Sequence, residues 1–180
     1  GSVWNRNLKI RFGNAVETWV YSENVSVTDS VFYDIYDSAV THQGLEACRP
    51  AVNFIIENNI FVKCGMAAYE QRDTMPLSVK FNHNICLAAG EGFSRLGEEM
   101  PRKSEIWPEP MGHHIFLWKI DKPTENSRFE IKNNFFGDSI YGSVIYSIIC
   151  REAEEQIDIS GNVYSSKKNI CLFRFFGENI

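Results

Sequence analysis

The sequence predicts an all-β solenoid, in which one chain winds into stacked coils, and two observations support this. First, a short phrase recurs five times: apolar residues stand five and three positions before an Asn or Ser, and a hydrophobic pair follows it. The clearest copy is Phe54-Ile55-Ile56-Glu57-Asn58-Asn59-Ile60-Phe61. Second, the copies are spaced regularly along the chain, which is typical of repeat proteins. The alternation predicts strands with one buried face, and stacked coils bury a continuous core.

The period of the repeat follows from the Asn or Ser that ends each phrase. These zero positions are Ser30, Asn59, Asn84, Asn134 and Asn162, so their spacings are 29, 25, 50 and 28 residues. An Asn tolerates the left-handed backbone of a sharp corner, and its amide can bond to the same amide one coil away. We therefore expect the four asparagines to line one edge of the solenoid, in a chain with almost no α-helix.

Three of these phrases resemble those of a known family. Glu57-Asn58-Asn59-Ile60-Phe61, Lys132-Asn133-Asn134-Phe135-Phe136 and Ser160-Gly161-Asn162-Val163-Tyr164 are similar to repeats of right-handed parallel β-helix proteins with the pectate-lyase-like architecture. The segment from Tyr33 to Gly44 resembles one that is common in bacterial members. The resemblance implies a single-stranded right-handed parallel β-helix of about six coils over residues 3–180. It also implies a secreted or cell-surface protein that cleaves or binds polysaccharide.

Composition restricts the class of protein and its partners. A chain of 180 residues that is 44% hydrophobic is sufficient for one domain with a real core. A formal charge of −5 argues against a nucleic-acid partner, which needs a clustered basic face. No apolar run approaches the length of a membrane span, so no membrane partner is expected.

The two ends of the sequence lack the polar cap that a solenoid needs over its first and last coils. Gly1-Ser2 is typical of the scar left when an expression tag is cleaved, so a signal peptide or upstream domain is expected to have been removed. We therefore expect a piece of a longer protein, or a further domain or subunit that covers the terminal coils.

The cysteine pattern indicates buried thiols without chemistry. Cys48, Cys64, Cys86, Cys150 and Cys171 are odd in number and have no zinc-site spacing. Cys86 stands where the other coils have an aromatic residue, which predicts a small core filler. The neighbours His113 and His114 should point to opposite sides of a strand, so neither a metal site nor a cofactor is expected.

The doubled spacing between Asn84 and Asn134 has two interpretations, a degraded extra coil or a single coil with an insertion. Residues 90–112 contain several prolines and glycines and no second Asn phrase, which favours an inserted loop. Long loops on a rigid scaffold are common places for function.

A candidate site follows if the third strands of the coils stack. One outer face would then collect ten residues, beneath Arg95 and Trp107 of the insertion: Glu17, Trp19, His42, Gln43, Glu70, Gln71, His114, Trp118, Tyr146 and Arg174. Aromatic rings stack on sugar rings, and fixed polar groups orient hydroxyls, so this face is a candidate sugar groove. The alternative is an ordinary solvated sheet face, which carries polar residues in any case.

Glu70 is the leading acid/base residue on this face, and His42 and His114 are candidates to orient groups or to transfer protons. Glycoside hydrolysis needs two carboxyl groups. Glu17, two coils from Glu70, would lie about 9.6 Å away, which suits an inverting enzyme. Asp34 and Asp37 are other possible partners, or they cap the turn instead.

A polysaccharide lyase needs a base and a group that neutralises the sugar carboxylate. His42, His114, Arg95 and Arg174 could provide these, although no acidic triplet of the calcium-binding kind appears. The resemblance, with these residues as candidates, therefore implies a glycoside hydrolase or polysaccharide lyase. A non-catalytic carbohydrate-binding or structural module is the alternative.

Overall fold

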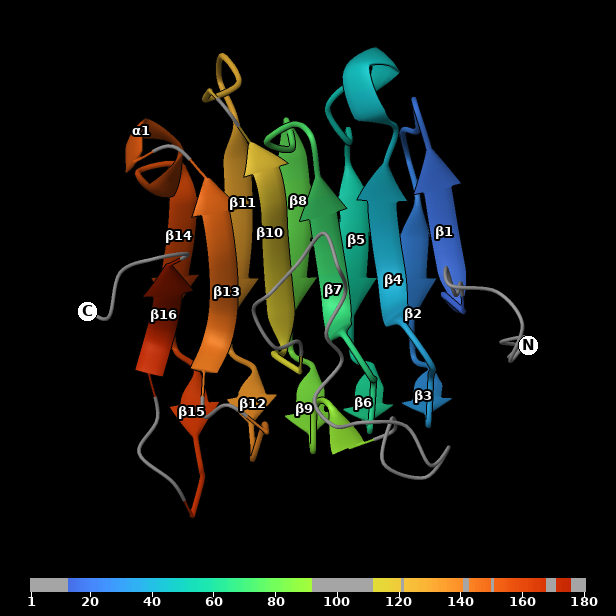
Figure 1. The fold of residues 1–180 in the computed structure, drawn as a ribbon, viewed down its shortest axis with the longest axis vertical. Helices are drawn as coiled ribbons and strands as arrows, with labels where there is room; N and C mark the ends of the chain where they lie inside the picture. Colours follow the sequence, from blue (N-terminus) through green and yellow to red (C-terminus); the bar gives the residue numbers. More distant parts are fainter. Residues whose placement is uncertain are drawn as a thin grey trace, which may run out of the picture.

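The structure is a computed structural model of the chain. It describes residues 13–91, 112–120, 122–140, 143–149, 151–167 and 171–175, and for residues 119, 143, 146–149 and 171–175 it describes the backbone alone. Almost all regular structure is strand (Figure 1). The described helices are the single-turn α1 (Arg151–Glu154) and the 3-10 turn η1 (Leu45–Ala47).

The strands form three parallel sheets that run the length of the molecule. Sheet 1 contains β1 (Val16–Trp19), β4 (Ser38–Gln43), β7 (Ala67–Arg72), β10 (Ile115–Ile120), β13 (Ser143–Ile149) and β16 (Cys171–Phe175). Sheet 2 contains β2 (Ser26–Thr28), β5 (Phe54–Glu57), β8 (Ser78–Asn82), β11 (Arg128–Lys132) and β14 (Ile157–Ser160). Sheet 3 contains β3 (Val31–Tyr33), β6 (Ile60–Val62), β9 (Ile85–Leu87), β12 (Phe135–Phe136) and β15 (Val163–Tyr164).

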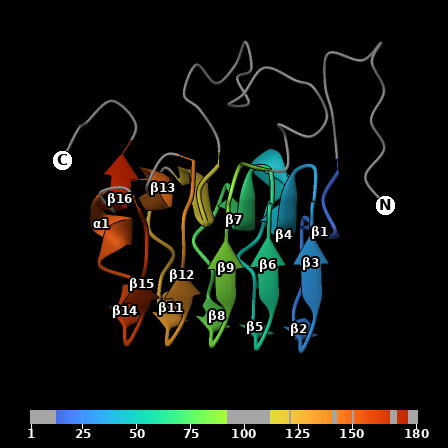
Figure 2. The same ribbon diagram turned by 90° about the horizontal axis from the view of Figure 1, so that it is seen from below.

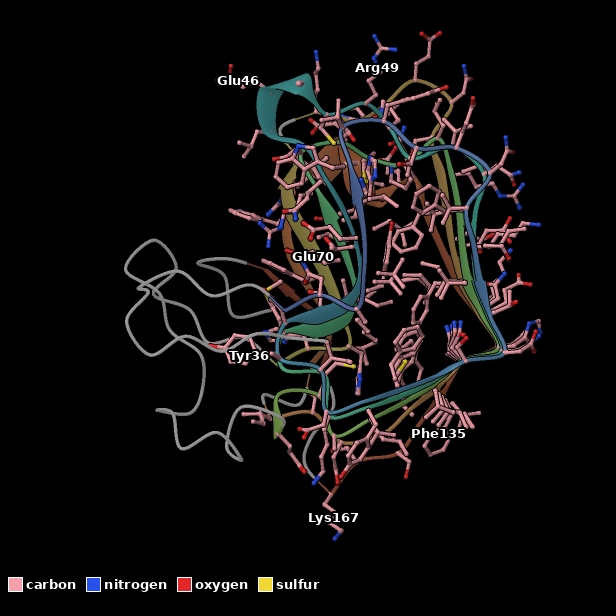
Figure 3. The ribbon with its side chains drawn as sticks, turned by 90° about the vertical axis from the view of Figure 1, so that its right-hand side faces the viewer. Tyr36, Glu46, Arg49, Glu70, Phe135 and Lys167 are labelled. Atoms are coloured by element: carbon pink, nitrogen blue, oxygen red, sulfur yellow. The ribbon has the colours of Figure 1, made fainter. Side chains whose placement is uncertain are left out.

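The predicted fold, a right-handed parallel β-helix, is confirmed. Each coil contributes one strand to each sheet, and β1 precedes the first full coil, so the described chain contains five complete coils and part of a sixth. Viewed from the N-terminal end in Figure 3, the chain turns clockwise as it recedes, which is the right-handed sense. Figure 2 shows the same coils from below, with the strands of sheet 3 side by side.

No additional coil separates Asn84 from Asn134 among the described strands. Strand β8 pairs directly with β11, and β9 pairs directly with β12, so no further coil lies between them. The extra residues therefore fall between β9 and β10. Residues 92–111 of the predicted insertion lie outside the described part of the chain.

The predicted asparagine ladder is present along the corner between sheets 2 and 3. The side-chain oxygens of Asn59, Asn84, Asn134 and Asn162 accept hydrogen bonds of 3.1, 3.0, 2.8 and 2.8 Å from the backbone N–H at the zero position of the preceding coil. Each side-chain NH₂ donates a 2.8 Å bond to a carbonyl of the preceding coil. Each asparagine thus bonds to the coil before it at two points.

The left-handed backbone conformation lies one residue before the position expected. Positive φ angles of 52° to 66° occur at Asp29, Asn58, His83, Asn133 and Gly161, which directly precede the zero positions. The zero-position asparagine instead points inward, where its amide replaces the strand hydrogen bonds that the corner interrupts.

A stack of aromatic rings fills the core beside this corner, and it explains Cys86. Phe61, Phe81 and Phe136 are stacked with ring-centroid distances of 5.8 and 6.4 Å. Cys86 pairs with Phe61 and Phe136 in sheet 3, where its small side chain leaves room for Phe81 to enter from sheet 2. The corresponding residues in neighbouring coils of sheet 2, Ile56 and Ile131, are smaller than Phe81. The prediction that Cys86 is a core filler is confirmed.

Among the described residues, no helix is long and apolar enough to cross a membrane.

Exchanging the sizes of Phe81 and Cys86 tests this packing. Phe81→Ile should leave a cavity, and Cys86→Phe should overfill the same space, so we expect each to destabilise the fold by about 1–3 kcal/mol. The double variant restores the residue types of the neighbouring coils. We therefore expect the double variant to lose less stability than the two single variants together. Its free energy of unfolding in urea should lie about 1 kcal/mol or more above the value expected from adding the two single losses. Strictly additive losses would show that the two side chains do not share one space.

Candidate functional site

The outer face of sheet 1 is organised by the register of its strands. Glu17, Thr41, Glu70 and Phe116 are successive partners, and the backbones of Tyr146 and Arg174 continue this first outer row. The second outer row, two residues further along the strands, contains Trp19, Gln43, Arg72 and Trp118. Between them lies an inner row: Thr18, His42, Gln71 and Leu117. Glu17 and Glu70 therefore lie in one row two strands apart, as the sequence predicted.

His42 does not lie on the outer face with Glu70, so its predicted place there is wrong. Its cross-strand partner is Gln71, whereas the partner of Glu70 is Thr41. Successive residues of a strand point to opposite faces, so a shift of one residue separates His42 from Glu70 by the thickness of the sheet. The His42 ring packs edge-on against Phe54 at 5.6 Å in the core.

Gln71 is also inside, and it is completely buried. Its side-chain oxygen accepts a 2.7 Å bond from the Tyr69 hydroxyl, and its NH₂ donates a 2.8 Å bond to the carbonyl of Thr74. Gln71 therefore closes the end of the core and is turned away from the predicted sugar groove.

His114 is a third predicted site residue that faces the interior. Its Nε2 lies 3.0 Å from the carbonyl of Gly137, and its ring lies 5.4 Å from that of Phe136. A bulge explains the error, because the N–H groups of Ala68 and Tyr69 both bond to the carbonyl of His114, at 2.9 and 3.3 Å. Simple alternation fails at such a bulge. Burial lowers the pKa of His114 to about 4, so the ring is neutral at pH 7.

Glu70 does lie on the outer face, where it is completely buried among donors (Figure 3). One carboxylate oxygen accepts hydrogen bonds of 3.1 Å from both the Ser38 and the Thr41 hydroxyls. The other accepts a charge-assisted bond from Nε of Arg72. The Arg72 guanidinium lies 4.2 Å from the ring centroid of Trp118, a cation–π contact.

The charge state of Glu70 depends on two opposing effects. Burial raises its pKa from 4.5 to about 6, because removing water destabilises the carboxylate, and the charge of nearby Asp37 acts in the same direction. Arg72 and the Ser38 hydroxyl oppose this rise, since they stabilise the carboxylate. A carboxyl group that titrates near pH 6 is suited to proton transfer, but in this structure the group has no exposed surface.

The N-terminal end of the same face is accessible. The Trp19 side chain is 52% exposed, and its cross-strand partner is Gln43. Gln43 donates a hydrogen bond from its NH₂ to the carboxylate of Glu17, which lies two residues from Trp19 on the same face of β1. An exposed ring therefore stands beside an exposed carboxylate, which the buried Gln43 amide orients.

Cys48 is not a buried thiol, contrary to what the cysteine pattern predicts. It lies in the loop after η1, partly exposed, with Sγ 3.6 Å from Nε2 of His42. The same nitrogen lies 2.8 Å from the carbonyl oxygen of Arg49, which can only accept, so Nε2 carries a hydrogen and is not a base toward the thiol. Burial also raises the pKa of Cys48 and lowers that of His42, so both groups are neutral. The pair is not an activated nucleophile.

The remaining predicted site residues are only partly described. Arg95 and Trp107 lie outside the described residues, and for Tyr146 and Arg174 the structure gives the position in the first outer row without the side chain. Trp118 and Gln43 lie on the outer face as expected, but both are buried, with 8% and 5% of their surface exposed. Within the described ranges, no three His, Cys, Asp or Glu side chains gather as metal ligands.

Comparison of the chain with protein-family models, curated proteins and solved structures found no match. The fold assignment therefore rests on the sheets, the coil register and the asparagine ladder.

The pH dependence of stability tests the environment of Glu70. Because its folded pKa lies above the unfolded value, its contribution is present below about pH 4.5 and is lost as the pH rises through about 6. The unfolding free energy of the wild type, minus that of Glu70→Gln, should therefore fall with pH across this window. Urea denaturation of both proteins between about pH 4 and pH 7 measures it. A difference that rises with pH would show that the Arg72 ion pair outweighs burial.

Proposed function

We propose that this protein is a carbohydrate-binding β-helix of the pectate-lyase-like type, secreted or displayed on a cell surface, that holds a polysaccharide at the outer face of sheet 1. The observation that carries the proposal is the exposed Trp19 ring beside the carboxylate of Glu17, which Gln43 orients. Sugar rings stack on aromatic faces, and carboxylates and amides bond to their hydroxyls. The resemblance of the repeat phrases to polysaccharide-active β-helices gives the ligand class.

The binding role is supported over catalysis by the surroundings of Glu70. A catalytic carboxyl group has to reach the substrate within hydrogen-bond distance. Ser38, Thr41 and Arg72 already occupy both oxygens of Glu70, and the group is fully buried. These contacts suit a residue that fixes the strands of sheet 1 to one another.

Glycoside hydrolysis is the second candidate, and it is favoured by the pKa of Glu70 near 6 and by a second acid, Asp37, close enough to raise that pKa. An acid with a raised pKa beside another carboxyl group is the arrangement that glycosidases use. A lyase is less well supported, because His42 and His114, the proposed bases, both point into the core.

Trp19→Ala tests the binding site. Removing the ring should weaken the affinity for a bound polysaccharide roughly tenfold or more, because stacking area is lost without any change to the core. Isothermal titration calorimetry against a panel of soluble neutral and acidic polysaccharides measures this. Tyr33→Ala, which removes an exposed aromatic from sheet 3, is the matched control and should leave affinity unchanged. Binding to no polysaccharide in the panel, or equal losses in both variants, would refute the proposed site.

Glu70→Gln separates the hydrolase from the binding module. The substitution preserves the shape and removes the titratable group, so a catalytic role predicts a loss of turnover of roughly 10²-fold or more with affinity retained. The readout is release of reducing ends from any polysaccharide that binds. Glu57→Gln, on the outer face of sheet 2 and outside the proposed site, is the control for a general effect of removing an acid. If binding is observed and the wild type releases no product, the module is non-catalytic.

A further inference from the structure

The outer face of sheet 3 carries a continuous row of apolar side chains. The first residue of each strand points outward, and the strands are in register, so Val31, Ile60, Ile85, Phe135 and Val163 form one line. Val31 and Val163 are 68% and 56% exposed, and Ile60 and Ile85 are 38% and 40% exposed. Phe135 projects from the lower edge of the molecule in Figure 3. Single exposed apolar residues are ordinary, but a contiguous row indicates an interaction surface.

The outer face of sheet 2 is different. There, Lys132 and Arg128 of β11 lie 2.6 and 3.9 Å from Asp158 of β14, so ion pairs join these two neighbouring strands. Both faces belong to the same coils and have the same strand spacing. The apolar character is therefore a property of the sheet 3 face and does not follow from the repeat itself.

A second row, at the far end of the sheet 3 strands, carries alternating charges. It consists of one residue per coil: Asp34, Lys63, Ala88, Asp138 and Ser166, with Lys167 following directly. From the first coil to the last, the charges are negative (Asp34), positive (Lys63), zero (Ala88) and negative (Asp138), and Lys167 adds a positive charge in the last coil. When a second copy of the row is reversed, each charged residue lies opposite one of the other sign, and Ala88 lies opposite Ala88. Two members of the row have contacts within the chain: Lys63 lies 3.9 Å from Glu91, a long and partly exposed pair, and Asp138 accepts hydrogen bonds from the Ser166 hydroxyl and the Lys167 N–H.

We propose that this face binds a second copy of the same chain, with the two solenoids antiparallel. The twofold axis lies between the two faces, parallel to the strands and directly above β9. In this arrangement, Ile85 meets the partner's Ile85, and Ile60 meets the partner's Phe135. The charged row supports this occupant, because Lys63 meets the partner's Asp138, and Asp34 meets the partner's Lys167. The surface is thus complementary to itself in one orientation.

The dimensions of the face determine the strength of this contact. Five strands spaced about 4.8 Å apart span about 19 Å, and the two rows lie about 10 Å apart along the strands. That footprint is well below the roughly 800 Å² per partner of a stable interface. The dimer is therefore weak, with a dissociation constant in the micromolar to millimolar range.

Sedimentation velocity of the whole chain across this concentration range tests the proposal. The wild type should shift reversibly from monomer to dimer. Ile85→Lys places two ammonium groups together on the twofold axis and should weaken dimerisation roughly tenfold or more. Ile55→Lys makes the same change on the outer face of sheet 2 and should have no effect. A wild type that stays monomeric throughout, or equal effects of the two variants, would overturn the proposal.

A charge exchange tests the antiparallel orientation. Lys63→Glu places two carboxylates opposite each other, so it should weaken dimerisation several-fold, and more at low salt. Adding Asp138→Lys restores opposite signs at the same place and should recover most of the affinity. Circular dichroism confirms that each variant is folded. If the double variant binds no better than Lys63→Glu alone, the two residues do not face each other and the orientation is wrong.

Discussion

The register between coils depends on the buried asparagine ladder. Asn59, Asn84 and Asn134 are almost completely buried, and each bonds to the preceding coil through both ends of its amide. A slip of one residue would remove these bonds and leave polar groups unpaired in the core, at a cost of about 1–3 kcal/mol for each group. The ladder therefore fixes which residue of each coil stacks on which, and so it also determines the composition of every surface row.

The fold was predictable because this constraint is visible in the sequence. The buried Asn and the alternation before it require the same residue types at the same positions of every coil. Across the doubled spacing, β8 still pairs directly with β11. Cys86 could be recognised as a core residue from its place in the phrase. That Phe81 fills the space left by its small side chain could not be recognised. Compensation between two sheets depends on distances across the core, which no local pattern contains.

The candidate site was predictable only in part, because the facing of a side chain changes with a single residue. His42 and Gln71 occupy the same place in their coils, 12 residues after Ser30 and Asn59, whereas Glu70 is one residue earlier in its coil and so faces the other way. For His114 the cause is the bulge beside Ala68 and Tyr69, which reverses the alternation before β10. The sequence has no mark for that bulge, since small and aromatic residues occur there as they do in regular strands.

A side chain that binds a partner must be hydrated beforehand, because the partner replaces its bound water. On sheet 1 this requirement separates Glu70 from Glu17 and Trp19. Glu70 has already exchanged its water for two hydroxyls and a guanidinium, so its interactions go toward holding the strands together. Trp19 and Glu17 remain hydrated at the first strand, where contact with a sugar would remove apolar surface from water. The same reasoning applies to the apolar row of sheet 3, which is repeated in every coil because the ladder repeats its position. Recognition therefore follows from what the repeat leaves exposed, while Glu70, the carboxyl group whose pKa burial raises, belongs to the scaffold.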